Sequence, residues 1–105
     1  MTLDKFNEIM TGQILRCKAV LTIKGDEYVF SDDRLEHFKT SAAEQDISPK
    51  QALWGMASKH FTSLGKMCKS DQMMIAEMWS EKITDAINYL LLLRALVTEE
   101  GEHNE

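Results

Sequence analysis

The sequence contains little that breaks or crosslinks a chain. It has a single proline, Pro49, and two cysteines, Cys17 and Cys68, with no C-x-x-C motif and no secretory signal pattern. These absences argue against a disulfide framework and against a zinc site of the usual spacing. We therefore expect reduced thiols in a cytoplasmic protein. Both cysteines fall within helical apolar patterns, so we expect both to be buried.

Long apolar runs and an excess of basic charge are also absent. The longest apolar run, residues 86–97, is interrupted by Asn88 and Arg94, and it is shorter than the about 20 residues that span a bilayer. The net charge is −5, whereas nonspecific binding to nucleic acid or to anionic membranes requires a cationic face. We therefore expect no membrane segment and no nonspecific nucleic-acid binding. The sequence also lacks a glycine-rich phosphate loop and a Gly-x-Ser-x-Gly nucleophile motif.

The composition is that of one globular domain. The chain has 105 residues, of which 44% are hydrophobic and 28% are charged, a balance that favours folding and a length that suits one core. Helical spacing of apolar residues dominates the sequence. We predict an all-α domain of four helices over residues 1–98, followed by an acidic, frayed tail over 99–105.

The first half of the chain predicts two helices joined by a short non-helical segment. Apolar residues recur at spacings of three and four from Thr2, a candidate N-cap, to Gly25, where we expect the first helix to end. Residues 26–31 favour extended or turn geometry but are too few to build a sheet. A short second helix then begins with Asp32 or Asp33 as its cap.

The second half of the chain predicts two longer helices. Residues 48–51, Ser-Pro-Lys-Gln, combine an N-cap serine, a proline at the first helical position and a glutamine that completes a capping box. The last helix, predicted over 72–98 with a cap at Ser70 or Asp71, has an apolar arc broad enough to be central or to form an oligomer interface. The arc comprises Ile75, Trp79, Ile83, Ala86, Ile87, Leu90, Leu93 and Val97.

A polar strip interrupts this apolar helix. Glu81, Asp85 and Asn88 stand at positions i, i+4 and i+7, so their side chains leave one face of the helix, with Lys82 and Tyr89 on either side. One interpretation is that the strip simply faces water. In the other, the strip lines a polar cleft, where carboxylates hold a metal ion or accept hydrogen bonds from a base or a ribose.

Candidate cationic residues occur singly rather than in a charged run. Lys24, Arg34, Lys59 and His60 each lie beside a predicted helix end or on an apolar face. The plain interpretation is that His60 is a hydrogen-bonded core residue, while Arg34 and Lys59 are surface charges or ion-pair partners of the acidic strip. The functional interpretation is an anion site, because lysine and the arginine fork suit phosphate and the second helix offers free amides at its start.

Together these residues form a pattern that resembles a family of small all-α bacteriophage proteins. The resemblance covers roughly residues 20 to 97 and implies a phage accessory protein that acts in the host cytoplasm. The matching residues are Lys24, Gly25, Tyr28, Asp32, Asp33, Arg34, Leu35, Phe38, Pro49, Leu53, Lys59, His60, Trp79, Glu81, Lys82, Asp85, Asn88 and Tyr89.

A weaker similarity connects the acidic residues to the MazG-like nucleoside triphosphate pyrophosphohydrolases. These all-α enzymes hold magnesium with an acidic pair and a third acid three residues later, and with a Glu and an Asp three apart on another helix. Asp32, Asp33 and Glu36 copy the first spacing, but Glu81 and Asp85 are four apart and aspartates replace the usual glutamates. The resemblance implies these five carboxylates as magnesium ligands.

Our leading hypothesis is a homo-oligomeric protein that binds and sequesters a nucleotide or cyclic-nucleotide signal. It needs no catalytic residue and no cofactor. The alternatives are a magnesium-dependent pyrophosphohydrolase and a protein-protein interaction module that uses the broad apolar surface of the last helix. The predicted ligand-binding residues are Lys24, Tyr28, Arg34, Lys59, His60, Glu81, Lys82, Asp85, Asn88 and Tyr89.

Overall fold

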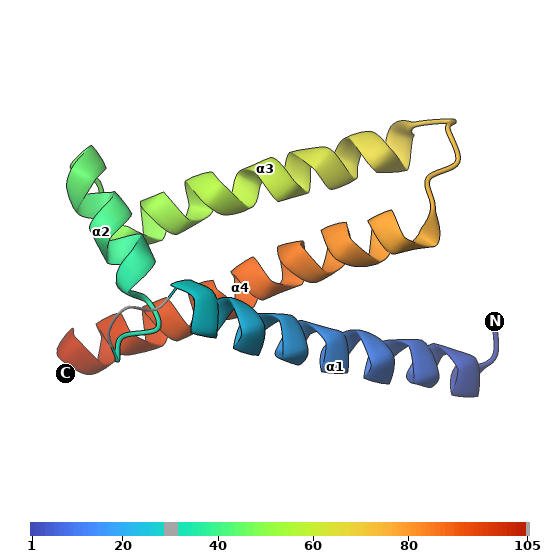
Figure 1. Ribbon diagram of the computed structural model, residues 1–105, viewed down its shortest axis with the longest axis horizontal. Helices are drawn as coiled ribbons and strands as arrows, with labels where there is room; N and C mark the ends of the chain where they lie inside the picture. The colour runs from blue at the N-terminus through green and yellow to red at the C-terminus, as the bar shows by residue number, and fades with distance from the viewer. Residues whose placement is uncertain (29–31, 105) are drawn as a thin grey trace.

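The computed structural model contains four helices (Figure 1), in chain order α1 (Leu3–Tyr28), α2 (Glu36–Gln45), α3 (Pro49–Lys69) and α4 (Ala76–Asn104). The structure describes the backbone of residues 1–28 and 32–104 and the side chains of 1–23 and 32–102, and no described residue is in a strand. This confirms the all-α prediction. α3 and α4 form an antiparallel hairpin, α1 packs on α4 and α2 packs across the start of α3 (Figure 1).

The start of α3 matches the sequence prediction. The backbone amide of Gln51 donates to Ser48 Oγ at 3.2 Å, and the amide of Ser48 donates to Gln51 Oε1 at 2.9 Å. Pro49 follows the cap, where its missing N–H leaves no hydrogen bond unmade. This capping box fixes the turn between α2 and α3, which begins at Asp46, a residue in the left-handed conformation with φ of 55°.

The predicted end of the first helix is wrong. α1 continues through Gly25 to Tyr28, so residues 26–28 are helical rather than extended, and residues 29–31 lie outside the described part of the chain. No described glycine has a positive φ, which means that Gly25 does not adopt the conformation of a helix terminus. A helix tolerates an interior glycine at a cost of about 1 kcal/mol.

The predicted limits of the last helix are also wrong. Ser70 closes α3 instead of capping α4, which begins only at Ala76. At the other end, α4 continues to Asn104, so residues 99–104 are helical rather than frayed. Ion pairs explain this extension: Glu99 contacts Lys39 at 2.5 Å and Glu100 contacts Lys50 at 3.1 Å.

The core joins α2, α3 and α4. Its buried cluster consists of Leu35, Phe38, Leu53, Ala57 and Leu96. Leu53 is fully buried and Leu96 is 1% exposed, and complete burial of such a side chain stabilises the fold by about 1.5–3 kcal/mol. The core therefore fixes the base of the α3 and α4 hairpin against the start of α2.

The two cysteines differ in their environments. Cys17 is buried as predicted, and Gln13 Nε2 lies 3.3 Å from its sulfur. Cys68 is exposed, contrary to the prediction. It follows the buried Met67 on α3 and points about 100° away from it around the helix.

None of the described helices combines the length and the hydropathy needed to span a membrane.

The inward side of α4 includes polar residues as well as apolar ones. Thr84 is 1% exposed and Asn88 is 5% exposed, so part of the polar strip faces the interior. Thr84 Oγ1 accepts a hydrogen bond of 2.8 Å from Gln13 Nε2 of α1. Conversely, four members of the predicted apolar arc are exposed: Ile75, Ile83, Leu90 and Val97. The arc is therefore only partly buried, since Ala86 is 5% exposed and Leu93 packs against the core.

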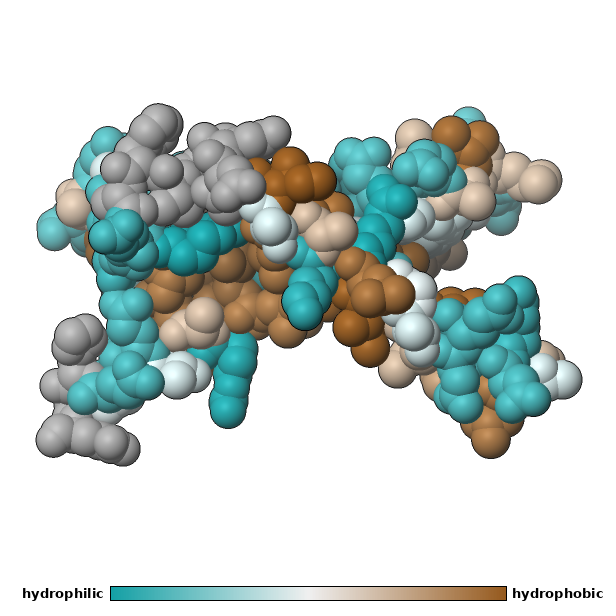
Figure 2. Space-filling model, turned by 60° about the horizontal axis from the view of Figure 1, so that its bottom comes forward, coloured by the Kyte–Doolittle hydropathy of each residue, from teal (hydrophilic) through white to brown (hydrophobic). Residues whose placement is uncertain are grey.

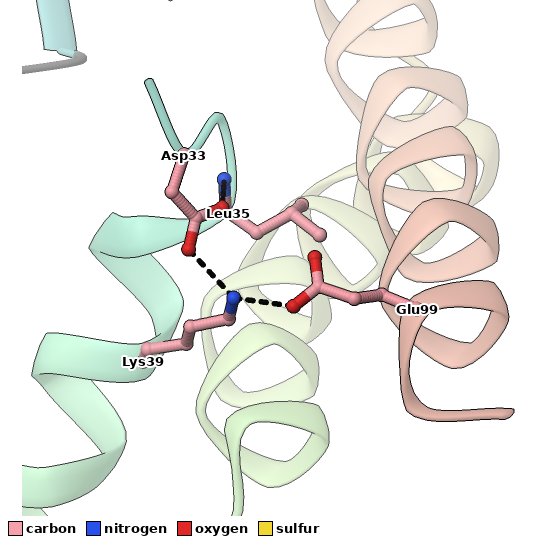
Figure 3. A network of polar contacts seen from close by, with 4 residues as sticks. All are labelled: Asp33, Leu35, Lys39 and Glu99. Carbon is pink, nitrogen blue, oxygen red and sulfur yellow. Dashed lines mark hydrogen bonds and ion pairs between the residues drawn. The ribbon is translucent and has the colours of Figure 1, made fainter. Parts of the chain in front are cut away.

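A three-residue ionic network holds the start of α2 to the end of α4 (Figure 3). Lys39 Nζ contacts Asp33 Oδ2 at 2.6 Å and Glu99 Oε1 at 2.5 Å. Asp33 Oδ1 also accepts the backbone amide of Leu35 at 2.9 Å. Leu35 is the N-cap of α2 and no described side chain caps this helix, so the predicted capping role of Asp32 or Asp33 is wrong. The hydrogen bonds from Lys39 and Leu35 lower the pKa of Asp33, and those to Asp33 and Glu99 raise the pKa of Lys39.

We predict that Lys39→Met lowers the free energy of unfolding at neutral pH by about 1 kcal/mol, because each partly exposed ion pair contributes about 0.2–1 kcal/mol. The pKa of Asp33 is lower in the folded state, so its contribution is lost as the pH falls below 3.8 and through the folded value. The difference in stability between wild type and Lys39→Met should therefore shrink in acid. Urea unfolding across pH measures it, and a constant difference would contradict the network.

Candidate functional site

A pocket of about 280 Å³ lies where α1, the start of α2 and the middle of α4 meet. It mixes polar side chains with aliphatic and aromatic ones, the usual composition of a small-molecule site. Its lining consists of Leu21 from α1, Arg34, His37 and Phe38 at the start of α2, and Asp85, Asn88, Tyr89 and Leu92 from α4.

Asn88 is the most unusual residue of this pocket. Its side chain is 5% exposed, yet neither its Oδ1 nor its Nδ2 has a hydrogen-bond partner among the described residues. A buried polar group without a partner costs about 1–3 kcal/mol, so natural folds retain few of them. Asn88 lines the pocket, and its amide carries a donor group and an acceptor group that no described residue satisfies.

Arg34 supplies the positive charge of the pocket. It is half-buried in the turn that precedes α2, one residue after Asp33 and five before Lys39. The ionic network through Lys39 anchors this turn to α4 and so brings Arg34 into the same pocket as Asn88. A guanidinium held in this way offers a planar fork of N–H donors that suits phosphate or carboxylate groups.

Asp85 and Tyr89 form the side of the pocket that faces α3. Asp85 Oδ2 lies 4.0 Å from His60 Nδ1, an ion pair when His60 is protonated. The rings of His60 and Tyr89 have their centroids 5.0 Å apart and are tilted by 36°. His60 does not line the pocket itself. It contacts two residues that do, Asp85 and Tyr89.

The polar strip of α4 divides between pocket and solvent. Asp85 and Asn88 line the pocket, as the cleft interpretation predicted, whereas Glu81 is exposed, as the alternative interpretation predicted. The described side chains contain no group of three or more His, Cys, Asp or Glu placed to hold a metal ion. The five carboxylates of the magnesium alternative, Asp32, Asp33, Glu36, Glu81 and Asp85, are therefore not assembled into one cluster.

The structure brings together four of the ten predicted ligand-binding residues, namely Arg34, Asp85, Asn88 and Tyr89. Lys59 is exposed and Lys82 is half-buried, and neither lines the pocket. Lys59 and His60 are neighbours on α3, but the helix turns them in different directions. The side chains of Lys24 and Tyr28 lie outside the described residues.

Sequence reasoning missed His37, Phe38, Leu21 and Leu92 as pocket residues. A signal for two of them was present, because Arg34, His37 and Phe38 have the i, i+3, i+4 spacing of one helical face. Nothing local marked Leu21 or Leu92, which look like ordinary core residues in their helices.

Comparison of the chain with models of protein families, with curated proteins and with solved structures finds no match. The geometry of the pocket is accordingly the basis for assigning a function.

We predict opposite effects on stability for two buried polar residues of α4. Thr84→Val should lower the free energy of unfolding by about 1 kcal/mol, because it removes the hydrogen bond from Gln13. Asn88→Leu should raise the free energy of unfolding by about 1 kcal/mol in the absence of ligand, because it removes an amide that has no partner. Urea denaturation of both variants measures this difference, and equal destabilisation would show that Asn88 is satisfied within the protein.

Proposed function

We propose that this protein binds a nucleotide and that the amide of Asn88 recognises the base. The observation that carries the proposal is the buried, unpartnered carboxamide in a pocket that also contains an arginine. An amide pairs well with a base edge, since bases present adjacent donors and acceptors and asparagine commonly forms two hydrogen bonds with adenine. Pairing with a ligand would remove the cost of leaving this amide buried without partners.

The other pocket residues fit the remaining parts of a nucleotide. Phe38 and Tyr89 offer aromatic contact for a base, and stacking on aromatic side chains is a common way to hold one. Asp85 can accept hydrogen bonds from ribose hydroxyls or from an exocyclic amino group. In this arrangement Arg34 pairs with phosphate, the group for which its fork geometry is suited.

The size of the pocket favours one nucleotide unit per site. Its volume of about 280 Å³ is slightly below the range of about 300 to 1,000 Å³ that is usual for ligand pockets. A mononucleotide, or one half of a cyclic dinucleotide, suits this space better than a whole dinucleotide does. We therefore propose that each pocket binds one nucleotide unit, which makes the hypothesis of a bound nucleotide or cyclic nucleotide more specific.

We propose capture of the nucleotide rather than its hydrolysis. What supports capture is that the described carboxylates of the magnesium alternative do not form a metal-binding group, while the unpartnered amide of Asn88 suits recognition. For a phage accessory protein acting in the host cytoplasm, such binding would withdraw a nucleotide signal from host defence. We also propose that the protein acts as a homo-oligomer.

Recovery of the bound molecule tests this function directly. The protein is incubated with a panel of nucleoside mono- and triphosphates and cyclic dinucleotides, with and without magnesium, then separated from free ligand and denatured. We expect an intact nucleotide in the released fraction, because binding requires no bond to break. Release of pyrophosphate and a monophosphate in the presence of magnesium would indicate hydrolysis instead, and an empty fraction throughout would refute the proposal.

We predict that Arg34→Gln weakens binding of the tightest nucleotide in that panel by about 10-fold or more, because it removes a charge-assisted contact with phosphate. Lys59→Gln is the matched control, since it removes an exposed cation outside the pocket and should leave the affinity unchanged. Isothermal titration calorimetry measures both variants. Equal loss in the two would indicate a general effect of net charge rather than a contact in the pocket.

Asn88→Leu separates recognition from folding. We expect this variant to lose nucleotide binding while its unfolding midpoint in the absence of ligand is no lower than that of the wild type, because only the ligand uses the amide. Calorimetry and thermal unfolding of the same sample give both quantities. Unchanged affinity would remove Asn88 from the site.

A further inference from the structure

The N-terminal half of α1 has an apolar face that the rest of the chain does not cover. Large apolar side chains recur there at helical spacing, and all of them are about half exposed or more: Leu3 at 73%, Phe6 at 50%, Ile9 at 48%, Met10 at 46% and Ile14 at 61%. We call this set the bare face of α1. On the same helix, Cys17 is buried and Gln13 bonds to α4.

The bare face arises because α1 and α4 diverge. Figures 1 and 2 both show the N-terminal end of α1 standing apart from the turn that joins α3 and α4. Figure 2 also shows hydrophobic side chains along the middle of the side on which α1 lies. On α4, Ile83, Leu90, Leu91 and Val97 are exposed as well. Monomeric soluble proteins rarely expose a continuous apolar surface of such extent.

The dimensions of the chain indicate how much surface another molecule must cover. Its accessible surface is 7855 Å², whereas a compact monomer of 12.0 kDa exposes about 6,000 Å². Its radius of gyration is 16.0 Å, against about 13 Å for a compact domain of this length. The chain therefore exposes about 1,900 Å² more surface than a compact monomer would. Twice this area, for two chains, lies within the about 2,000–5,000 Å² of total surface that obligate homodimer interfaces bury.

We propose that a second copy of this chain covers the bare face of α1 in an obligate homodimer. The area favours a large apolar partner over a small ligand, and a net charge of −5 disfavours an anionic lipid surface. Side chains at spacings of three and four form the ridges by which helices pack on one another. A two-fold contact uses the same patch on both chains, so one apolar face suffices for both copies.

This inference does not rest on nucleotide binding, because no residue of the bare face lines the pocket. A monomeric protein would therefore remove the proposed homo-oligomer but leave nucleotide binding in the pocket intact. Leu21 of the pocket belongs to the C-terminal half of α1, which packs on α4 within the same chain. The monomer and the dimer are thus expected to contain the same pocket residues.

The test is the molar mass of the full chain in solution across a dilution series, by light scattering after size exclusion. We expect the wild type to have twice the 12.0 kDa mass of one chain. Met10→Glu places a carboxylate in the proposed interface and should weaken association at least about 100-fold, since an unpaired charge buried at an interface costs several kcal/mol. Met73→Glu is the matched control, because Met73 is 99% exposed between α3 and α4, and it should remain dimeric.

Several results would overturn the proposal. A wild type that is monomeric at every concentration would show that another partner, or none, covers the bare face. A dimeric Met10→Glu would place the interface elsewhere, and a monomeric Met73→Glu would indicate a general effect of added charge. Circular dichroism verifies that Met10→Glu remains helical. If it unfolds, Phe6→Ser, a milder change on the same face, must give the monomer, and a dimeric Phe6→Ser would count against the proposal.

Discussion

A hydrogen bond from Gln13 of α1 to Thr84 of α4 joins the two helices in the orientation that turns Thr84 inward. Because Thr84 is turned inward, Asn88, about one turn further along, is also buried. The opposite face of α4, which carries Ile83 and Leu90, is then left to solvent. The polar pocket depends on this orientation of α4, because Asp85 and Asn88 line it.

The pocket needs a second constraint, because its residues come from distant parts of the chain. Lys39 is held between Asp33 and Glu99, which fastens the turn containing Arg34 to the last helix. The charged end of α4 therefore has a structural role that positions a candidate binding residue. Arg34 and Asn88 lie 54 positions apart in the sequence, and only this packing brings them to one pocket.

Two features of the fold are unfavourable when the chain is considered alone. One is the buried amide of Asn88, which has no partner among the described residues, and the other is the exposed face around Met10. Natural sequences depart from favourable local choices mainly at functional sites. A small polar ligand would satisfy the amide, and a second copy would cover the apolar face. These are separate partners, because the two features lie on different parts of the molecule.

Local signals were sufficient to predict four helices, the capping box at Ser48 and the common face of Asp85 and Asn88, because each depends on residues within one or two turns. Helical periodicity shows which residues share a face, but it does not show which neighbour covers that face. Tertiary packing alone decided that Thr84 and Asn88 of α4 face inward and that His37 rather than Lys59 joins the pocket. These outcomes depend on contacts between helices, whose energies exceed the local preferences of single residues.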